Sequence, residues 1–136
     1  MEKLRVKTGS RNEMVDITDK VSLMVKKMGI MDGILHLFVP HTTCGLAVNE
    51  NADPSVKADI SGKLCGLVPE AGGYNHFEGN SDSHIKAALT GSCLSLFVEE
   101  GVLLLGRWQG IFLCEFDGPR EREVWLKSVR QGDKPF

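Results

Sequence analysis

The chain has 136 residues, of which 42% are hydrophobic and 25% are charged, and its net charge is −2 at pH 7. This length and composition suit a single domain, residues 1–136, with one hydrophobic core. The small net charge predicts no general affinity for nucleic acid, and no apolar run approaches the roughly 20 residues that span a bilayer. The first residues also lack the apolar stretch of a secretory signal, so we expect a cytoplasmic protein.

Turn residues and apolar spacing predict the elements of the first half of the chain. Residues 4–8 and 14–17 suggest the two strands of a hairpin, because Gly9-Ser10-Arg11-Asn12 supplies turn chemistry between them. A helix is predicted from Thr18 to Gly29, strands at 33–39 and 44–48, and a second helix that Asp53 caps. The residues expected to face inward from the two helices are Val21, Met24, Val25, Met28, Val56, Ile60, Leu64 and Leu67.

The second half predicts one more helix and a series of strands. The helix begins at Asn80 or Ser81, which would cap it, and ends at Gly91, with Ile85, Ala88 and Leu89 facing inward. Strands follow at 94–98, 102–106, 111–116 and 123–129, the first two as a hairpin. Strands interrupted by about three single helices indicate a compact α+β domain with a largely antiparallel sheet.

The cysteines form no Cys-x-x-Cys pair, which argues against a zinc ribbon or a redox motif. All four, Cys44, Cys65, Cys93 and Cys114, lie in or beside predicted strands or helices. We therefore expect buried, reduced thiols. The alternative is a catalytic cysteine, for which Cys44 is the best candidate because it follows His41-Thr42-Thr43.

Three of the four histidines lie in or beside predicted loops, where binding groups often occur. His41, His76 and His84 could share one ion, because neutral imidazole is a common zinc ligand. Alternatively, each histidine hydrogen-bonds a loop carbonyl. His36 lies inside a predicted strand, so we place it outside the site.

An anion is the other ligand that the same region could hold. The N–H groups at the start of the helix near Asn80 favour negative charge, and His84 and Arg120 could act as counter-charges. Ordinary capping at Asn80 or Ser81 needs no such ligand. Arg120 could equally pair with Glu121 or Glu123 at the surface.

Glu50 is the best candidate for acid–base chemistry or metal contact, because Asp53 already has a role as a helix cap. His41 and Glu50 lie at opposite ends of a predicted strand, however. Nine residues of extended chain separate them by roughly 25–30 Å. A site shared between subunits would remove this conflict, as would a bulge or sharp bend in the strand. We expect a homo-oligomer with sites between subunits.

The polar stretches together resemble the YjbQ-like family, also called secondary thiamine-phosphate synthase. The resemblance covers nearly the whole chain. It rests on Pro-His-Thr-Thr-Cys-Gly-Leu at 40–46, Asn-Glu-Asn-Ala-Asp-Pro-Ser-Val at 49–56, Asn75-His76 with Asn80 and His84, Leu-Gly-Arg-Trp-Gln-Gly at 105–110, and Glu-Phe-Asp-Gly-Pro-Arg at 115–120. Arg107 departs from the smaller residue usual in the family, and no role is assigned to it.

The resemblance implies a trimeric α+β protein with polar sites between subunits. It implies that His41, His76 and His84 belong to one site with a divalent metal ion, zinc or magnesium. It also implies a transferase that joins a pyrimidine pyrophosphate to a thiazole phosphate and releases pyrophosphate. We assign catalysis to Glu50, His41 and Asn49. Binding of the phosphorylated substrate is assigned to Arg120, Asn80, Thr42, Thr43, Gln109 and Asp53.

Two other functions stay open at the level of the sequence. A zinc-type hydrolase would hold its ion with three histidines and activate water with Glu50. A non-catalytic, ligand-binding trimer would use the polar stretches as subunit contacts.

Overall fold

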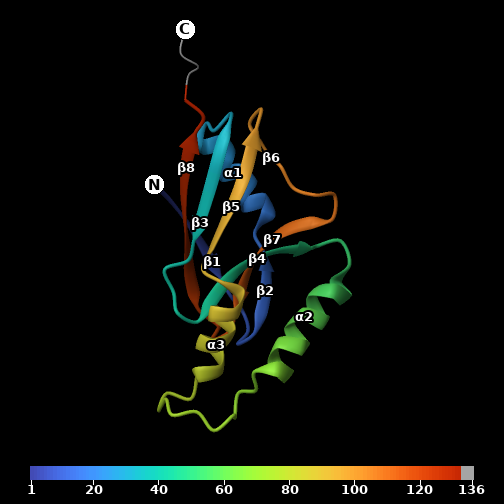
Figure 1. Ribbon diagram of the computed structural model, residues 1–136, viewed down its shortest axis with the longest axis vertical. Coiled ribbons are helices and arrows are strands. Elements are labelled where there is room, and N and C mark those ends of the chain that lie inside the picture. The colour runs from blue at the N-terminus through green and yellow to red at the C-terminus, as the bar shows by residue number, and fades with distance from the viewer. Residues whose placement is uncertain (133–136) are drawn as a thin grey trace.

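The computed structural model describes residues 1–132, which form two antiparallel sheets and three helices (Figure 1). The five-stranded sheet has the order β1-β8-β3-β5-β6, and the three-stranded sheet has the order β2-β7-β4. The strands are β1 (Glu2–Lys7), β2 (Glu13–Asp16), β3 (Gly33–Phe38), β4 (Cys44–Glu50), β5 (Cys93–Glu99), β6 (Val102–Leu103), β7 (Gln109–Glu115) and β8 (Glu121–Arg130). The helices are α1 (Thr18–Met28), α2 (Pro54–Leu67) and α3 (Ser81–Thr90).

This architecture confirms the predicted α+β class with antiparallel sheets and three helices. In the part of the chain that the structure describes, no helix has the length and apolar character needed to cross a membrane.

Strand β7 lies between two hydrophobic cores. Its residues Ile111 and Leu113 point into the larger core, which the two sheets and α1 share. Phe112 and Cys114, with Phe116 just beyond the strand, point to the other side, into a smaller core on which Ile60 and Leu64 of α2 rest. Because successive strand residues face opposite ways, a run that is apolar at every position suits this double burial.

The predicted hairpin of the first two strands is wrong. Both strands exist, but β1 pairs with β8 and β2 pairs with β7, so the chain crosses from one sheet to the other between them. Glu13 fixes this crossing, because its Oε2 accepts the N–H groups of Gly9 at 2.7 Å and Ser10 at 3.2 Å. Turn residues signal that the chain changes direction, and they do not specify which strand it meets next.

Helix α2 starts as predicted, because the Asp53 carboxylate accepts the N–H of Ser55 at 2.9 Å. Its predicted apolar face is only weakly covered. None of residues 54–67 is buried, and Leu67 is 65% exposed. The helix therefore projects from the body of the molecule (Figure 1).

The inward face predicted for α3 is also wrong. Ile85 and Leu89 are exposed, whereas the buried residues of the helix are Asp82, Ser83, Lys86 and Ala87. The Lys86 ammonium lies 3.3 Å from Asp82, and Arg11 lies 3.0 Å from the same carboxylate. Paired charges therefore occupy the side of the helix that apolar residues were expected to fill.

A glycine lets the C-terminal end of α3 pack closely against β4. A side chain at Gly45 would collide with Thr90, and the next residue, Leu46, donates its N–H to the carbonyl of Gly91 at 3.0 Å. This packing brings the first turns of α3 beside the loop that precedes β4.

Candidate functional site

One open cavity of about 350 Å³ gathers polar residues from separate segments of the chain. The loop before β4 supplies His41, Thr42 and Thr43, the start of α3 supplies His84, and the region between β7 and β8 supplies Arg120. The lining residues are Pro40, His41, Thr42, Thr43, Glu78, Asn80, His84, Asp117, Arg120 and Arg122. Six of them, His41, Thr42, Thr43, Asn80, His84 and Arg120, are residues that the sequence selected.

Arg122 lies at the base of this cavity and is held by a buried carboxylate. Its Nε and Nη2 donate to the two oxygens of Glu115, at 2.9 and 2.5 Å, and Nη2 also donates to Thr43 Oγ1 at 2.8 Å. Glu115 is 0% exposed and Arg122 is 4% exposed. None of the contacts made within residues 1–132 uses Nη1 of Arg122, which leaves this group free for a ligand.

The environment of Glu115 keeps its carboxyl ionised. Burial alone would raise its pKa, but hydrogen bonds from Arg122, Thr8 and the Asp117 backbone together lower the pKa below its ordinary value. The same contact with Glu115 outweighs burial for Arg122 and raises the pKa of its guanidinium. The ion pair is therefore permanent at neutral pH and fixes a positive charge at the cavity wall.

Asp117 organises the opposite wall. Its Oδ2 accepts from Asn80 Nδ2 and from Arg120 Nη2, both at 3.0 Å, and Arg11 Nη1 lies 3.4 Å from its Oδ1. Asn80 occupies the N-cap position of α3, as predicted, but its side chain makes no capping hydrogen bond. Arg120 pairs with Asp117, whereas Glu121 pairs with Arg5. The Arg120 side chain is 53% exposed, so its guanidinium can turn toward a ligand.

His41 is arranged as a neutral ring. Its Nε2 accepts the backbone N–H of Glu123 at 2.9 Å, so the ring proton lies on Nδ1. Burial, followed by the nearby Arg122 charge, lowers the pKa of the imidazole. At neutral pH the ring therefore offers one N–H donor and no positive charge.

His84 connects this cavity to a second one of about 600 Å³. The second cavity is lined by Gly73, Tyr74, Asn75, His76, Ser81, His84 and Ile85. The rings of His76 and His84 meet edge to face, with their centroids 5.6 Å apart. All three predicted histidines thus lie along one continuous surface, while His36 stays apart on β3 and contacts Ser95 Oγ at 2.9 Å.

These histidines do not form a three-ligand metal site within one chain. Nε2 of His41 is occupied by Glu123, and Nε2 of His76 lies 3.6 Å from Glu78. Among residues 1–132, no group of three or more His, Cys, Asp or Glu side chains is placed to hold an ion. The expected divalent metal therefore stays a prediction.

The cysteines differ from one another in exposure. Cys44 and Cys114 are buried as expected, but Cys65 is partly exposed and Cys93 is exposed. Burial raises the pKa of Cys44 to about 11. A thiol that stays protonated at neutral pH is a poor nucleophile, so Cys44 is not suited to covalent catalysis.

The family model described as UPF0047 protein YjbQ-like matches residues 2–131. The chain belongs to this family. It is 48% identical over 132 residues to a UPF0047 protein of Methanocaldococcus jannaschii, spanning 97% of this chain and 94% of that protein. It is 43% identical over 130 residues to the UPF0047 protein YugU of Bacillus subtilis, spanning 95% and 98% respectively. The resemblance to the YjbQ-like family that the sequence suggested is thus confirmed.

Solved structures of the YjbQ-like family share the fold. A crystal structure of an uncharacterized conserved YjbQ/UPF0047 protein of Clostridium acetobutylicum is similar with a TM-score of 0.92 and 46% identity, over 95% of this chain and 100% of that one. A conserved hypothetical protein of Thermus thermophilus is similar with a TM-score of 0.89 and 48% identity, over 95% and 100%.

The remaining residues selected from the sequence lie at the far end of β4. Glu50 pairs in register with Gln109, whereas Cys44, at the cavity end of the same strand, pairs with Glu115. Gln109 also accepts the N–H of Gly106 at 2.7 Å. Within one chain, this group of Asn49, Glu50, Asp53 and Gln109 does not reach the cavity.

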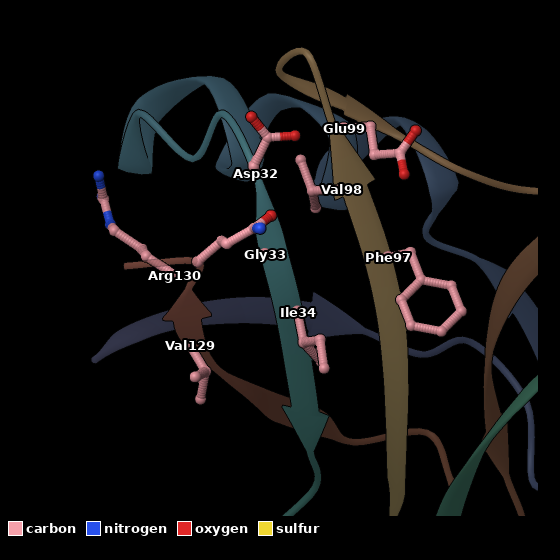
Figure 2. Close-up of a pocket in the computed structure, with 9 residues that line it drawn as sticks. Asp32, Gly33, Ile34, Phe97, Val98, Glu99, Val129 and Arg130 are labelled. Atoms are coloured by element: carbon pink, nitrogen blue, oxygen red, sulfur yellow. The ribbon is translucent and has the colours of Figure 1, made fainter. Parts of the chain in front are cut away.

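A different hollow of about 330 Å³ lies on the outer face of the five-stranded sheet (Figure 2). Its floor is apolar, with Ile34, Phe97 and Val129 side by side on β3, β5 and β8, and Asp32, Glu99 and Arg130 lie toward its end. Phe97 is 63% exposed and Val129 is 58% exposed. This hollow contains none of the histidines and marks an apolar surface that residues 1–132 leave uncovered.

Sequence reasoning missed Arg122 as a site residue, although a signal was present. Arg122 shares the inward-facing side of β8 with the buried Val124 and Leu126. A charged side chain at such a position must have a buried partner, and Glu115 at the end of an apolar strand was the candidate. Glu78 and Asp117 carried no comparable signal, because both lie in loops.

Proposed function

We propose that the chain is a transferase of the secondary thiamine-phosphate synthase type. The proposed reaction joins a pyrimidine pyrophosphate to a thiazole phosphate and releases pyrophosphate. The observation that carries this proposal is the pair of adjoining cavities that share His84. One is lined by two arginines and hydroxyl groups, which suit phosphate oxygens. The other is lined by Tyr74 and His76, which suit the face of a flat heterocycle.

The chemistry requires a site that stabilises a leaving group. The thiazole nitrogen attacks the methylene carbon of the pyrimidine, the carbon–oxygen bond breaks, and both electrons leave with the pyrophosphate. Fixed donors aimed at that developing charge lower the barrier. Arg122 supplies a donor that is already oriented by Glu115, and His41 supplies an N–H without adding charge. Arg120 can exchange Asp117 for the leaving phosphate.

The proposal includes a trimer in which a neighbouring subunit completes the site. Glu50 and Asn49, assigned to catalysis, lie at the opposite end of β4 from His41. A second copy that brings its Glu50 end to the cavity would unite the two groups.

Calorimetric titration with pyrophosphate tests the anion site. Wild-type protein is expected to bind, and Arg120→Ala is expected to bind about tenfold to a hundredfold more weakly, because it loses a charge-assisted hydrogen bond. Arg107→Ala is the matched control, since Arg107 is exposed and lies outside the cavity. Equal affinities for the two variants would refute the assignment of the cavity to phosphate.

Turnover tests the reaction itself. Pyrophosphate release is expected only when both the pyrimidine pyrophosphate and the thiazole phosphate are present. Release from the pyrimidine pyrophosphate alone would indicate hydrolysis instead. If the protein binds pyrophosphate but releases none when both substrates are present, the non-catalytic, ligand-binding trimer remains as the function.

A metal-dependent hydrolase is the second candidate, and the contact between the His76 and His84 rings favours it. Metal analysis of protein purified without added metal separates the two functions. Stoichiometric zinc, with turnover lost on chelation, would support the hydrolase.

A further inference from the structure

A buried lysine joins α2 to α3 through a cysteine. Lys86 of α3 is 1% exposed, and each of its three N–H donors has an acceptor. Its Nζ lies 2.6 Å from Asn12 Oδ1, 3.3 Å from Asp82 Oδ2 and 3.9 Å from the Sγ of Cys65 in α2. The amine is therefore held in place by two strong partners and directed at the sulfur by the third contact.

Cys65 differs from the two buried cysteines in a way that matters for reactivity. Burial raises the pKa of Cys44 to about 11 and that of Cys114 to about 12, so both remain inert thiols. Cys65 is partly exposed and lies against an amine. Reactive cysteines typically combine partial exposure with a basic neighbour. An oxidant can thus reach the sulfur while the nitrogen stays fixed beside it.

We propose that Cys65 and Lys86 form an oxidative modification site, in which one oxygen atom becomes a covalent bridge between Sγ and Nζ. The ammonium first gives one proton to the Asp82 carboxylate, which lies 3.3 Å away. The neutral amine and the thiol then each lose one hydrogen to dioxygen. One oxygen atom enters the N–O–S bridge and the other leaves as water. Sulfur and nitrogen are oxidised, and dioxygen takes up the four electrons. A thiol reductant reverses the step.

The bridge would change the part of the molecule that carries the second cavity. Residues 68–80 connect α2 to α3 and include Tyr74, His76, Glu78 and Asn80, which line the two cavities. Helix α2 has no buried residue and rests on the smaller core only through the partly buried Ile60 and Leu64. A covalent bond between Cys65 and Lys86 would close the connection into a loop and restrict its motion.

Tryptic mapping of the whole protein tests the proposal. In the reduced protein, trypsin cleaves after Lys63, Lys86 and Arg107, which gives peptides 64–86 and 87–107. After incubation under oxygen, the bridged nitrogen of Lys86 should resist cleavage. The expected product is a single peptide 64–107 that has gained one oxygen atom and lost two hydrogen atoms. Treatment with dithiothreitol should restore the two shorter peptides.

Two variants make the test specific. Cys65→Ser should keep normal cleavage after Lys86 under oxygen, whereas Cys93→Ser, which removes the exposed cysteine of β5, should still form the bridge. The proposal fails if the oxidised wild-type protein carries only added oxygen on Cys65 and is still cleaved after Lys86. It also fails if Cys65→Ser shows the same resistant peptide.

Discussion

The ion pair of Arg122 and Glu115 lies where the hydrophobic core meets the cavity. A buried pair of this kind adds little net stability when complete, but removing one partner leaves an uncompensated charge. Arg122 also contacts Thr43, so the pair links β7, β8 and the loop before β4. The same two residues therefore serve the fold and the site.

Glu115→Gln is expected to lower the free energy of unfolding by about 3–5 kcal/mol, because Arg122 would stay buried without a counter-charge. Urea denaturation followed by circular dichroism measures this change. Glu121→Gln is the matched control, because Glu121 is exposed and pairs with the exposed Arg5. The control is expected to change stability by less than about 0.5 kcal/mol. Equal stabilities for the two variants would show that the ion pair does not hold the fold.

The stability of the wild-type protein should also depend on pH through Glu115. Its pKa lies below the ordinary value of 4.5, so its contribution is complete above that value and is lost as the pH falls through the lower, folded-state pKa. The difference in unfolding free energy between wild type and Glu115→Gln should therefore shrink as the pH drops below 4.5. A difference that stays constant down to acid unfolding would contradict the prediction.

His41 should carry its proton on Nδ1 at neutral pH, because Nε2 accepts the Glu123 N–H and burial lowers the pKa of the ring. Long-range proton–nitrogen NMR spectra distinguish the two neutral tautomers and the charged ring. The His41→Gln variant assigns the signals. A spectrum with the proton on Nε2, or with both nitrogens protonated at pH 7, would remove His41 as a neutral donor to a phosphate.

At the scale of elements, the buried side of α3 carries charged residues, whereas its sequence suggests apolar ones. The stability of this helix should depend on its buried charges more than on its leucine. Asp82→Asn is expected to cost about 3–5 kcal/mol, because Lys86 is buried beside it. Leu89→Ala, at a residue that is 63% exposed, should change the stability of a single chain by less than about 0.5 kcal/mol. Thermal melts of both variants measure the two effects, and a larger loss for Leu89→Ala would show that another subunit covers it.

The sequence predicted the elements of this fold more reliably than their contacts. Periodicity, Asp53 and Gly29 located helices α1 and α2, because caps and spacing are local properties. The face of α3 and the partner of β2 were predicted wrongly, since both depend on residues distant in the chain, such as Arg11 and β7. The cavity residues His41, His84 and Arg120 were found because loop-borne polar groups stand out. Arg122 was missed although Glu115 was a candidate partner, because their pairing is established only once β7 and β8 are placed.

At the scale of the whole molecule, the outer face of the five-stranded sheet is the expected subunit contact. Large apolar side chains that are exposed on neighbouring strands, here Phe97 and Val129, mark an interaction surface. Phe97→Glu is therefore expected to convert a trimer into smaller species, as measured by sedimentation equilibrium. Leu23→Glu is the control, because Leu23 is 65% exposed on α1 rather than on the sheet. A wild-type protein that sediments as a monomer, or a Phe97→Glu variant that stays trimeric, would rule out this surface as the contact.

A site shared between subunits should be restored by mixing two inactive variants. Arg120→Ala removes a cavity residue, and Glu50→Gln removes the proposed acid–base group at the far end of β4. Each variant alone is expected to lose pyrophosphate release, Glu50→Gln by roughly 10²–10⁴-fold.

In a mixed trimer, an intact cavity from the Glu50→Gln chain can meet an intact Glu50 from the Arg120→Ala chain. Random assembly of equal amounts should produce such a pairing at about a quarter of the interfaces. The measurement is turnover after the two variants are unfolded and refolded together, with separately refolded samples as controls. Recovery to about a quarter of wild-type activity would show that each site uses two chains. No recovery would show that Glu50 and Arg120 of one site come from the same chain.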